Sequence, residues 1–174
     1  RKELNDGIIQ RDRDQEFSRE LWDKCGEIGL MGLCVPTQFG GSGYNAFDTA
    51  LALEALGYGS EDGGLNFAIA AHLLACVVPI VRHGTEKQKH QWLPGLASGK
   101  LIAANAMTES EAGSDVSAIS SVAVKEENGY RINGAKTFSS NSPVADVAFF
   151  YAKTNKEKGM MGGLSAFVLD KGRH

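Results

Sequence analysis

One segment divides this chain, and its residues are Ala106-Met107-Thr108-Glu109-Ser110-Glu111-Ala112-Gly113-Ser114-Asp115. Helical periodicity precedes the segment, and strand-like periodicity follows it. Its glycine lets a backbone approach a flat or phosphorylated ligand closely, and the N–H groups of such a bend can form a concavity that binds oxygen atoms. Thr108 and Ser114 add hydroxyl groups that donate and accept hydrogen bonds. An ordinary turn between strands has the same composition, so the residues alone leave a ligand-binding loop and a plain turn as alternatives.

The composition is that of an ordinary globular protein. The chain has 174 residues, of which 43% are hydrophobic, and 18 basic against 21 acidic side chains give a net charge of −3. Because the basic residues form no block, the charge argues against nucleic acid as the main partner. No apolar run reaches the length of a membrane span, and the polar first residues do not form a signal peptide.

The cysteines and histidines form no recognisable site. The three cysteines, an odd number without close pairs, indicate free or buried thiols in a reducing compartment. The four histidines lack the spacing of metal ligands, so we expect no metal site.

The first half of the chain predicts helices. Apolar residues from Phe17 to Ile28 recur every three or four positions, which is typical of an amphipathic helix. A second helix is expected from Phe47 or Asp48, capped by Asn45 or Ser42, and ended by the glycines at positions 57 and 59.

A third predicted helix covers residues 65–82 and is apolar nearly all round, which is typical of a central, buried helix. Pro79 is expected to kink or end it. His72 lies on this helix, and we interpret it as a satisfied core or interface histidine rather than a catalyst.

A capping box opens the next predicted helix. Thr85 stands at the N-cap, and Gln88 follows three residues later. We expect a short helix that reaches Gln91 or Trp92 and is ended by Pro94.

After Gly99 the pattern changes to strands, with a hairpin turn expected at Asn128-Gly129. Strands are expected at residues 101–107, 119–125, 130–132, 144–152 and 164–169, with a turn at 159–163. The fold class is therefore α+β: an N-terminal helical domain over residues 1–99, followed by an incomplete, antiparallel, β-barrel-like middle domain over residues 100–174. Because the chain stops just after a strand whose edge needs a partner, we expect it to be part of a longer polypeptide. A complete small domain with a charged edge is the alternative.

The central segment, with Ala118, resembles the first signature of the flavin-dependent acyl-CoA dehydrogenases. Four further segments are similar to the same family in the same order, so the resemblance covers nearly the whole chain. They are Gly29-Leu30-Met31-Gly32-Leu33 with Pro36 and Phe39-Gly40-Gly41; Gly84-Thr85-Glu86-Lys87-Gln88-Lys89 with Leu93-Pro94; Asn133-Gly134 with Lys136; and Phe167-Val168.

The resemblance implies the family's N-terminal helical and middle β-domains, without its C-terminal helical bundle, and FAD as the cofactor. It implies that Met107 and Thr108 lie near the flavin pyrimidine edge, and that Ser114 lies near the cofactor or the acyl-thioester arm of the substrate. The family's Trp-Ile-Thr triplet beside the flavin corresponds to Phe138-Ser139-Ser140. There the hydroxyl of Ser140 is expected to bond the N5 region.

Elementary chemistry agrees with these residue types. A flavin that takes up hydride gains negative charge near N1 and C2=O, where backbone N–H groups and the Thr108 hydroxyl are suitable donors. Phe138 offers a flat apolar face, although without the resemblance it would be read as a core aromatic in a strand. We assign no catalytic role to Glu109, and we expect Asp115 to cap or pin the loop.

Several positions depart from the family pattern. Ser110 stands where proline is usual, Phe138 replaces tryptophan, and Ser140 replaces threonine. Ser142 stands where glycine is common. The family's catalytic glutamate belongs to the C-terminal helical domain, so no catalytic residue is assigned within this sequence.

The implied function is a flavin-dependent dehydrogenase that introduces an α,β double bond into an acyl thioester of coenzyme A or an acyl carrier protein. The resemblance also implies electron-transfer flavoprotein or a similar acceptor, a homo-oligomer (dimer or tetramer), and a cytoplasmic or mitochondrial-matrix location. Two alternatives remain open. One is an oxygen-using acyl-CoA oxidase or flavin monooxygenase of the same architecture, and the other is a non-catalytic or half-site subunit.

Overall fold

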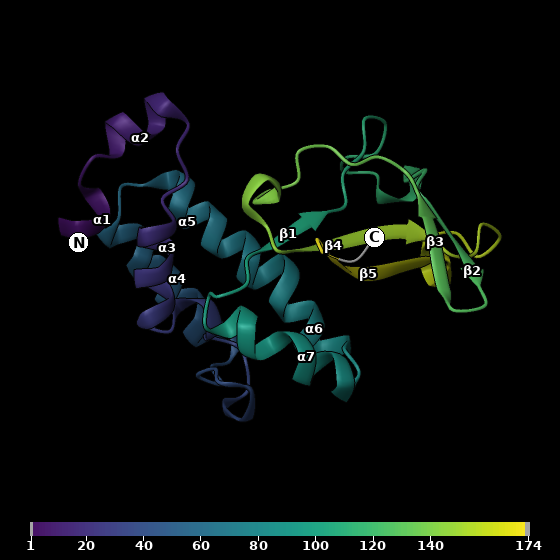
Figure 1. Cartoon of the computed structure of the whole chain (residues 1–174), viewed down its shortest axis with the longest axis horizontal. Coiled ribbons are helices and arrows are strands. Elements are labelled where there is room, and N and C mark those ends of the chain that lie inside the picture. Colours follow the sequence, from purple (N-terminus) through teal and green to yellow (C-terminus); the bar gives the residue numbers. More distant parts are fainter. Residues whose placement is uncertain (1, 173–174) are drawn as a thin grey trace. The chain divides into compact units, whose positions relative to one another are not determined.

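A computed structural model of the protein describes residues 2–172 (Figure 1). The chain forms two compact units, Arg1–Ala103 and Ala104–His174. The first unit is helical and the second is built on a sheet, so the predicted α+β class is confirmed. The two units are described separately below.

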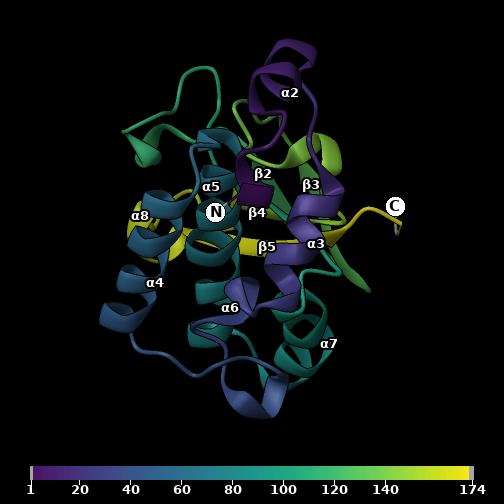
Figure 2. The same cartoon turned by 90° about the vertical axis from the view of Figure 1, so that its left-hand side faces the viewer.

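The helices of the first unit begin where the sequence provides caps. Asn45 Oδ1 accepts the Asp48 N–H at 2.9 Å, and both halves of the Thr85–Gln88 capping box are formed, as predicted. Figure 2 shows α4 beside α5. The elements are α1 (Lys2–Asn5), α2 (Ile8–Asp14), α3 (Arg19–Glu27), η1 (Leu30–Gly32), η2 (Thr37–Phe39), α4 (Ala46–Gly59), α5 (Gly63–Ala70), η3 (Ala71–Val77), α6 (Val78–His83) and α7 (Glu86–Ala97).

Neither proline ends its helix. The predicted stop at Pro94 was wrong, and of the two outcomes expected for Pro79, a kink or an end, the structure excludes the end. Pro79 lies just after the start of α6, and the π-helical segment η3 directly before it joins α5 and α6 into one helix. A π-helical turn widens the helix, which makes room for a ring that would otherwise clash with the preceding turn. Pro94 lies inside α7, which continues to Ala97. There the helix loses only the one hydrogen bond that the proline nitrogen cannot donate.

The joined helix Gly63–His83 is the one described segment with the length and apolar composition of a membrane span, which corrects the expectation from the sequence. The core helix of a globular unit has the same properties, and four residues of η3 are buried: His72, Leu73, Cys76 and Val77. The helix is not buried all round, because Phe67 is 65% and Leu74 is 49% exposed.

His72 is a satisfied core histidine, as predicted. Its Nδ1 lies 3.1 Å from the Ala103 nitrogen, and its Nε2 lies 3.1 Å from the Leu96 oxygen. Since the Ala103 N–H can only donate, Nδ1 accepts and Nε2 carries the proton that is donated to Leu96. The edge of the ring meets Trp22, with centroids 5.2 Å apart, and burial lowers the pKa of His72 to about 4.

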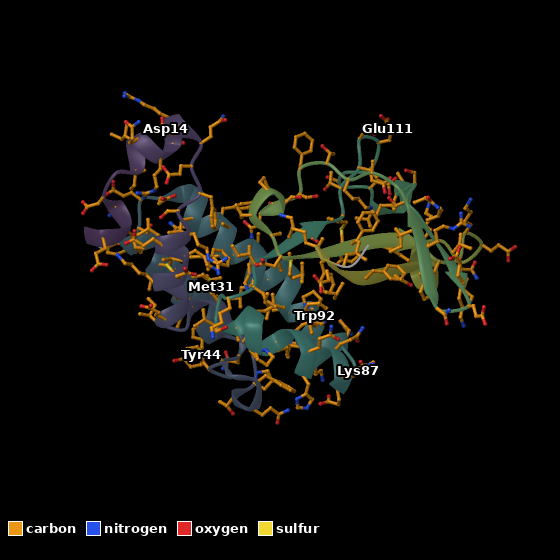
Figure 3. The ribbon with its side chains drawn as sticks, in the orientation of Figure 1. Asp14, Met31, Tyr44, Lys87, Trp92 and Glu111 are labelled. Atoms are coloured by element: carbon orange, nitrogen blue, oxygen red, sulfur yellow. The ribbon has the colours of Figure 1, made fainter. Side chains whose placement is uncertain are left out.

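The thiols are free, in line with the prediction. Cys25 and Cys76 are buried and Cys34 is half-buried. Met31, labelled in Figure 3, is also fully buried in this unit.

The second unit is a mixed five-stranded sheet. β4 pairs with β5 in antiparallel fashion from Val147↔Asp170 to Lys153↔Leu164. The predicted hairpin joins β2 and β3, but its turn lies one residue earlier than expected, at Glu127 and Asn128, because Gly129 belongs to β3 and pairs with Glu126. The sheet was expected to be antiparallel, but β2 meets β4 in parallel at Val122↔Lys153, and residues 159–163 contain a short helix rather than a plain turn. The elements are β1 (Ala103–Ala106), η4 (Val116–Ala118), β2 (Val122–Glu126), β3 (Gly129–Asn133), η5 (Ser142–Val144), β4 (Val147–Lys153), α8 (Met160–Gly163) and β5 (Leu164–Asp170).

The buried imidazole predicts a pH dependence of stability. Its pKa is depressed in the folded protein, so its contribution is complete above the unfolded value of about 6.5 and is lost as the pH falls toward 4, by up to about 1.4 kcal/mol per pH unit. We expect His72→Gln to flatten this part of the curve of unfolding free energy against pH in the intact protein. The exposed residue His83 provides the control, since His83→Gln should leave the slope intact. Equal slopes in both variants would contradict the assignment.

Candidate functional site

The central segment folds around the buried carboxylate of Glu109, which is 6% exposed. Ser120 N–H donates to Glu109 Oε2 at 2.6 Å, and Ser121 N–H donates to Oε1 at 3.0 Å. Both serine hydroxyls bond the same carboxylate. Glu109 and Ala112 also exchange backbone hydrogen bonds of 3.0 and 3.2 Å, so the turn closes with Ser110 in place of the family's proline.

Lys136 completes this arrangement, which we call the Glu109 cluster (Glu109, Ser120, Ser121 and Lys136). Its Nζ lies 2.8 Å from Glu109 Oε1, and the two side chains are only 4% and 5% exposed. The ammonium also stands 4.9 Å from the centroid of the Phe150 ring. Burial alone raises the pKa of the Glu109 carboxyl, but hydrogen bonds from Lys136 and the two serines outweigh it and hold the pKa well below its usual range. The low pKa favours the ionised form of Glu109, and its hydrogen bonds fix the carboxylate in place.

The loop after β1 and the segment after β3 lie side by side (Figure 1). Lys136 Nζ donates to the Met107 carbonyl at 2.9 Å, and Thr137 N–H donates to the Thr108 carbonyl at 2.9 Å. The two predicted cofactor-binding segments, 107–108 and 138–140, are therefore held next to each other. At the tip of the first loop Glu111 is exposed (Figure 3).

Phe138 is the most unusual residue of the second segment. Its side chain is 89% exposed, and its φ is +51°, in the left-handed region that non-glycine residues rarely occupy. It is therefore not the core strand aromatic that the sequence alone suggested. Backbone strain of this kind clusters at active sites and ligand clamps, so Phe138 is a candidate for contact with a ligand.

The remaining predicted residues are placed as follows. Met107, Thr108, Ser139 and Ser140 are half-buried, whereas Ser114 is exposed. Ser114 lies outside the contacts that join the two segments. Asp115 accepts the Ser117 N–H at 2.9 Å and caps η4, and bonds from Ser117 lower the pKa of Asp115; the expected capping role is confirmed.

Sequence reasoning did not identify the Glu109 cluster. Glu109 and Lys136 are 27 positions apart, and helical or strand periodicity links no such pair. The available signals were the lysine after Asn133-Gly134 and the adjacent serines at 120 and 121.

The chain thus combines a helical unit with a mixed sheet, and in the sheet unit two polar loops are held together next to the exposed ring of Phe138. The family models match both units: "Acyl-CoA dehydrogenase, N-terminal domain" over residues 1–100, and "Acyl-CoA dehydrogenase, middle domain" over residues 104–174. The chain belongs to the acyl-CoA dehydrogenase family, and the resemblance seen in the sequence is confirmed.

Three relatives show how similar its neighbours are. The L-prolyl-(peptidyl-carrier protein) dehydrogenase of Serratia sp. is 50% identical over 90% of this chain and 40% of its own length. A structure described as PigA with FAD and proline superposes with a TM-score of 0.92 at 47% identity, covering 97% of this chain and 44% of that one. The prolyl acyl carrier protein oxidase AnaB gives a TM-score of 0.91 at 38% identity, over 98% and 45%. The chain thus spans less than half the length of these relatives.

The packing of the Glu109 cluster can be tested at Gly134, which lies close to Ser121. In Gly134→Ala, the new Cβ would lie 2.0 Å from Ser121 Oγ and 2.8 Å from Ser121 Cα. We expect the free energy of unfolding to fall by about 1–3 kcal/mol, because the serine that holds Glu109 must move. A Cβ added at Gly113 would meet open space, with no atom beyond its chain neighbours within 4 Å, so Gly113→Ala should change stability by less than about 0.5 kcal/mol. Equal losses would mean that the cluster is not tightly packed.

Proposed function

We propose that the protein to which this chain belongs is a flavin-dependent oxidoreductase that removes hydrogen from the α and β carbons of an acyl thioester. The observation that carries the proposal is the juxtaposition of Met107-Thr108 with the segment from Lys136 to Ser140. The second support is Phe138, whose ring is exposed and whose backbone lies in the left-handed region. Family membership agrees with it.

The residues of the two loops fit FAD. Backbone N–H groups and the Thr108 hydroxyl suit the oxygen- and nitrogen-bearing edge of a flavin, and Phe138 offers an apolar face that keeps water from the ring system. In this proposal Ser139 and Ser140 lie beside the flavin, with the Ser140 hydroxyl as a donor toward its N5 region. Ser114 would bind the cofactor or the thioester arm. FAD supplies the hydride acceptor, and these residues bind and orient it.

The substrate class that we propose is an aminoacyl thioester, with a prolyl group on a carrier protein as the first candidate. Support comes from the 50% identical relative, which is named for a prolyl group on a peptidyl-carrier protein, and from the 47% identical PigA structure with FAD and proline. An acyl-CoA thioester is the competing substrate within the same reaction type.

An oxidase is the second candidate, because AnaB is described as an oxidase and superposes closely on this chain. The two functions differ only in what reoxidises the flavin. Rapid reoxidation by air, with peroxide formed, would select the oxidase, whereas slow reoxidation would favour electron-transfer flavoprotein or a similar acceptor.

Other properties remain proposals of ours. They are the domain division at residues 99 and 100, a dimeric or tetrameric assembly, and a cytoplasmic or mitochondrial-matrix location. A non-catalytic subunit is the alternative role for a chain of this fold.

The reaction is tested with the intact protein purified with its natural cofactor. We expect visible flavin absorbance that is bleached by a prolyl thioester on a carrier protein and is bleached less by saturated acyl-CoA. Bleaching by acyl-CoA alone would change the substrate and keep the reaction. An intact protein that is colourless and cannot be reconstituted with FAD would end the proposal.

The role of Phe138 is tested by truncation. We expect Phe138→Ala to weaken FAD binding about tenfold, which corresponds to about 1.4 kcal/mol of lost contact, while the FAD-free protein keeps its stability because the ring is 89% exposed. The matched variant Phe138→Trp keeps an aromatic face and should retain FAD. If titration gives both variants the affinity of the native protein, Phe138 does not contact the cofactor.

A further inference from the structure

The carbonyl groups of Met107 and Thr108 are both held by the segment after β3. Lys136 Nζ binds the Met107 carbonyl, and Thr137 N–H binds the Thr108 carbonyl, each at 2.9 Å. In a trans peptide, the C=O of one residue and the N–H of the next point in opposite directions. The described residues contain no cis peptide, so the bond from Lys136 turns the Thr108 N–H away from the lysine.

The lysine itself has little freedom to move. Its ammonium lies between the Met107 carbonyl, Glu109 Oε1 at 2.8 Å and the Phe150 ring. Glu109 is fixed in turn by N–H and hydroxyl donors of Ser120 and Ser121. Because charges that leave water need complete hydrogen bonding to be tolerated, the cluster favours one arrangement over alternatives.

We propose that Lys136 is a positioning residue: tethered by Glu109, it fixes the orientation of the Met107–Thr108 peptide and thereby aims the Thr108 N–H at the pyrimidine edge of the flavin. This inference rests on the proposed function. Lys136 does not touch the cofactor, since its ammonium is directed to Met107 and Glu109 and its side chain is 4% exposed. It acts through the peptide.

The tether has a consequence for redox chemistry. The pyrimidine edge of a flavin becomes more negative on reduction, so a donor aimed at it stabilises the reduced form more than the oxidised form. If the Thr108 N–H is no longer directed at the flavin, the binding of reduced FAD should therefore weaken more than that of oxidised FAD. A tenfold difference between the two lowers the two-electron reduction potential by about 30 mV.

The test compares two variants of the buried pair with two variants of an exposed pair in the intact protein. Lys136→Met removes the ammonium, and Glu109→Gln keeps the size of the side chain while removing the charge that tethers it. The controls are Arg131→Met and Glu126→Gln, which break an ion pair of 2.7 Å between side chains that are 63% and 52% exposed. Three quantities are measured: the amide exchange rate of Thr137 in FAD-free protein, the Kd for FAD, and the reduction potential.

We expect Lys136→Met to speed Thr137 exchange at least tenfold, to raise the Kd for FAD at least tenfold, and to lower the potential. Glu109→Gln should change all three in the same direction by less, and the controls should change none. If the reduction potential of the flavin is unchanged in both Lys136→Met and Glu109→Gln, the positioning role is overturned, even if these variants are less stable. If Lys136→Met does not fold, Glu109→Gln decides by the same criteria.

The two proposals fail in different ways. Native protein that binds no FAD defeats the proposed function, and the exchange of Thr137 in FAD-free protein then still reports whether the tether exists. If the native protein binds FAD, but Lys136→Met and Glu109→Gln leave Thr137 exchange and the reduction potential unchanged, only the positioning role of Lys136 is refuted.

Discussion

The buried carboxylate of Glu109 is the constraint on which the loops of the sheet unit depend. A charge removed from water is destabilising unless its oxygens are fully hydrogen-bonded and an opposite charge lies close by. Here the ammonium of Lys136 provides the charge, and Ser120 and Ser121 provide N–H and hydroxyl donors. Glu109 lies in the turn after β1, and its partners come from the approach to β2 and the segment after β3, so satisfying one carboxylate fixes three separate pieces of backbone.

This arrangement explains how exposed functional groups can be held rigidly. Loop residues on a surface normally move, because few contacts restrain them. Met107 and Thr108 are restrained through their carbonyl groups, and in our proposal the Thr108 N–H and hydroxyl are the groups that bind the flavin. The left-handed backbone of Phe138 is maintained between Thr137, which is bonded to Thr108, and Ser139, whose carbonyl accepts the Ser142 N–H at 3.1 Å. Strain of this kind persists only where neighbouring residues enforce it.

The sequence predicted the features that depend on residues close together in the chain, and it failed where residues far apart in the chain decide the outcome. The Asn45 cap, the Thr85–Gln88 capping box and the β2–β3 hairpin were predicted because each depends on residues a few positions apart. The predicted stop at Pro94 was wrong, and Pro79 does not end its helix. A proline removes only one backbone donor, and the packing of residues distant in sequence, together with the π-helical segment η3, offsets that loss.

The sequence by itself determined the order of helices and strands, the capping of the helices, the family, and the two segments proposed to bind a flavin. These features are encoded by residue types at short spacing, and a linear pattern records them. Only the tertiary structure decided that Phe138 faces solvent on a left-handed backbone, that β2 and β4 run in parallel, and that Glu109 and Lys136 are partners. Those outcomes depend on which distant segments meet. The strand pairing and the Glu109–Lys136 pair follow from the need to bury apolar surface and to provide partners for buried charges, whereas the exposure of Phe138 does not.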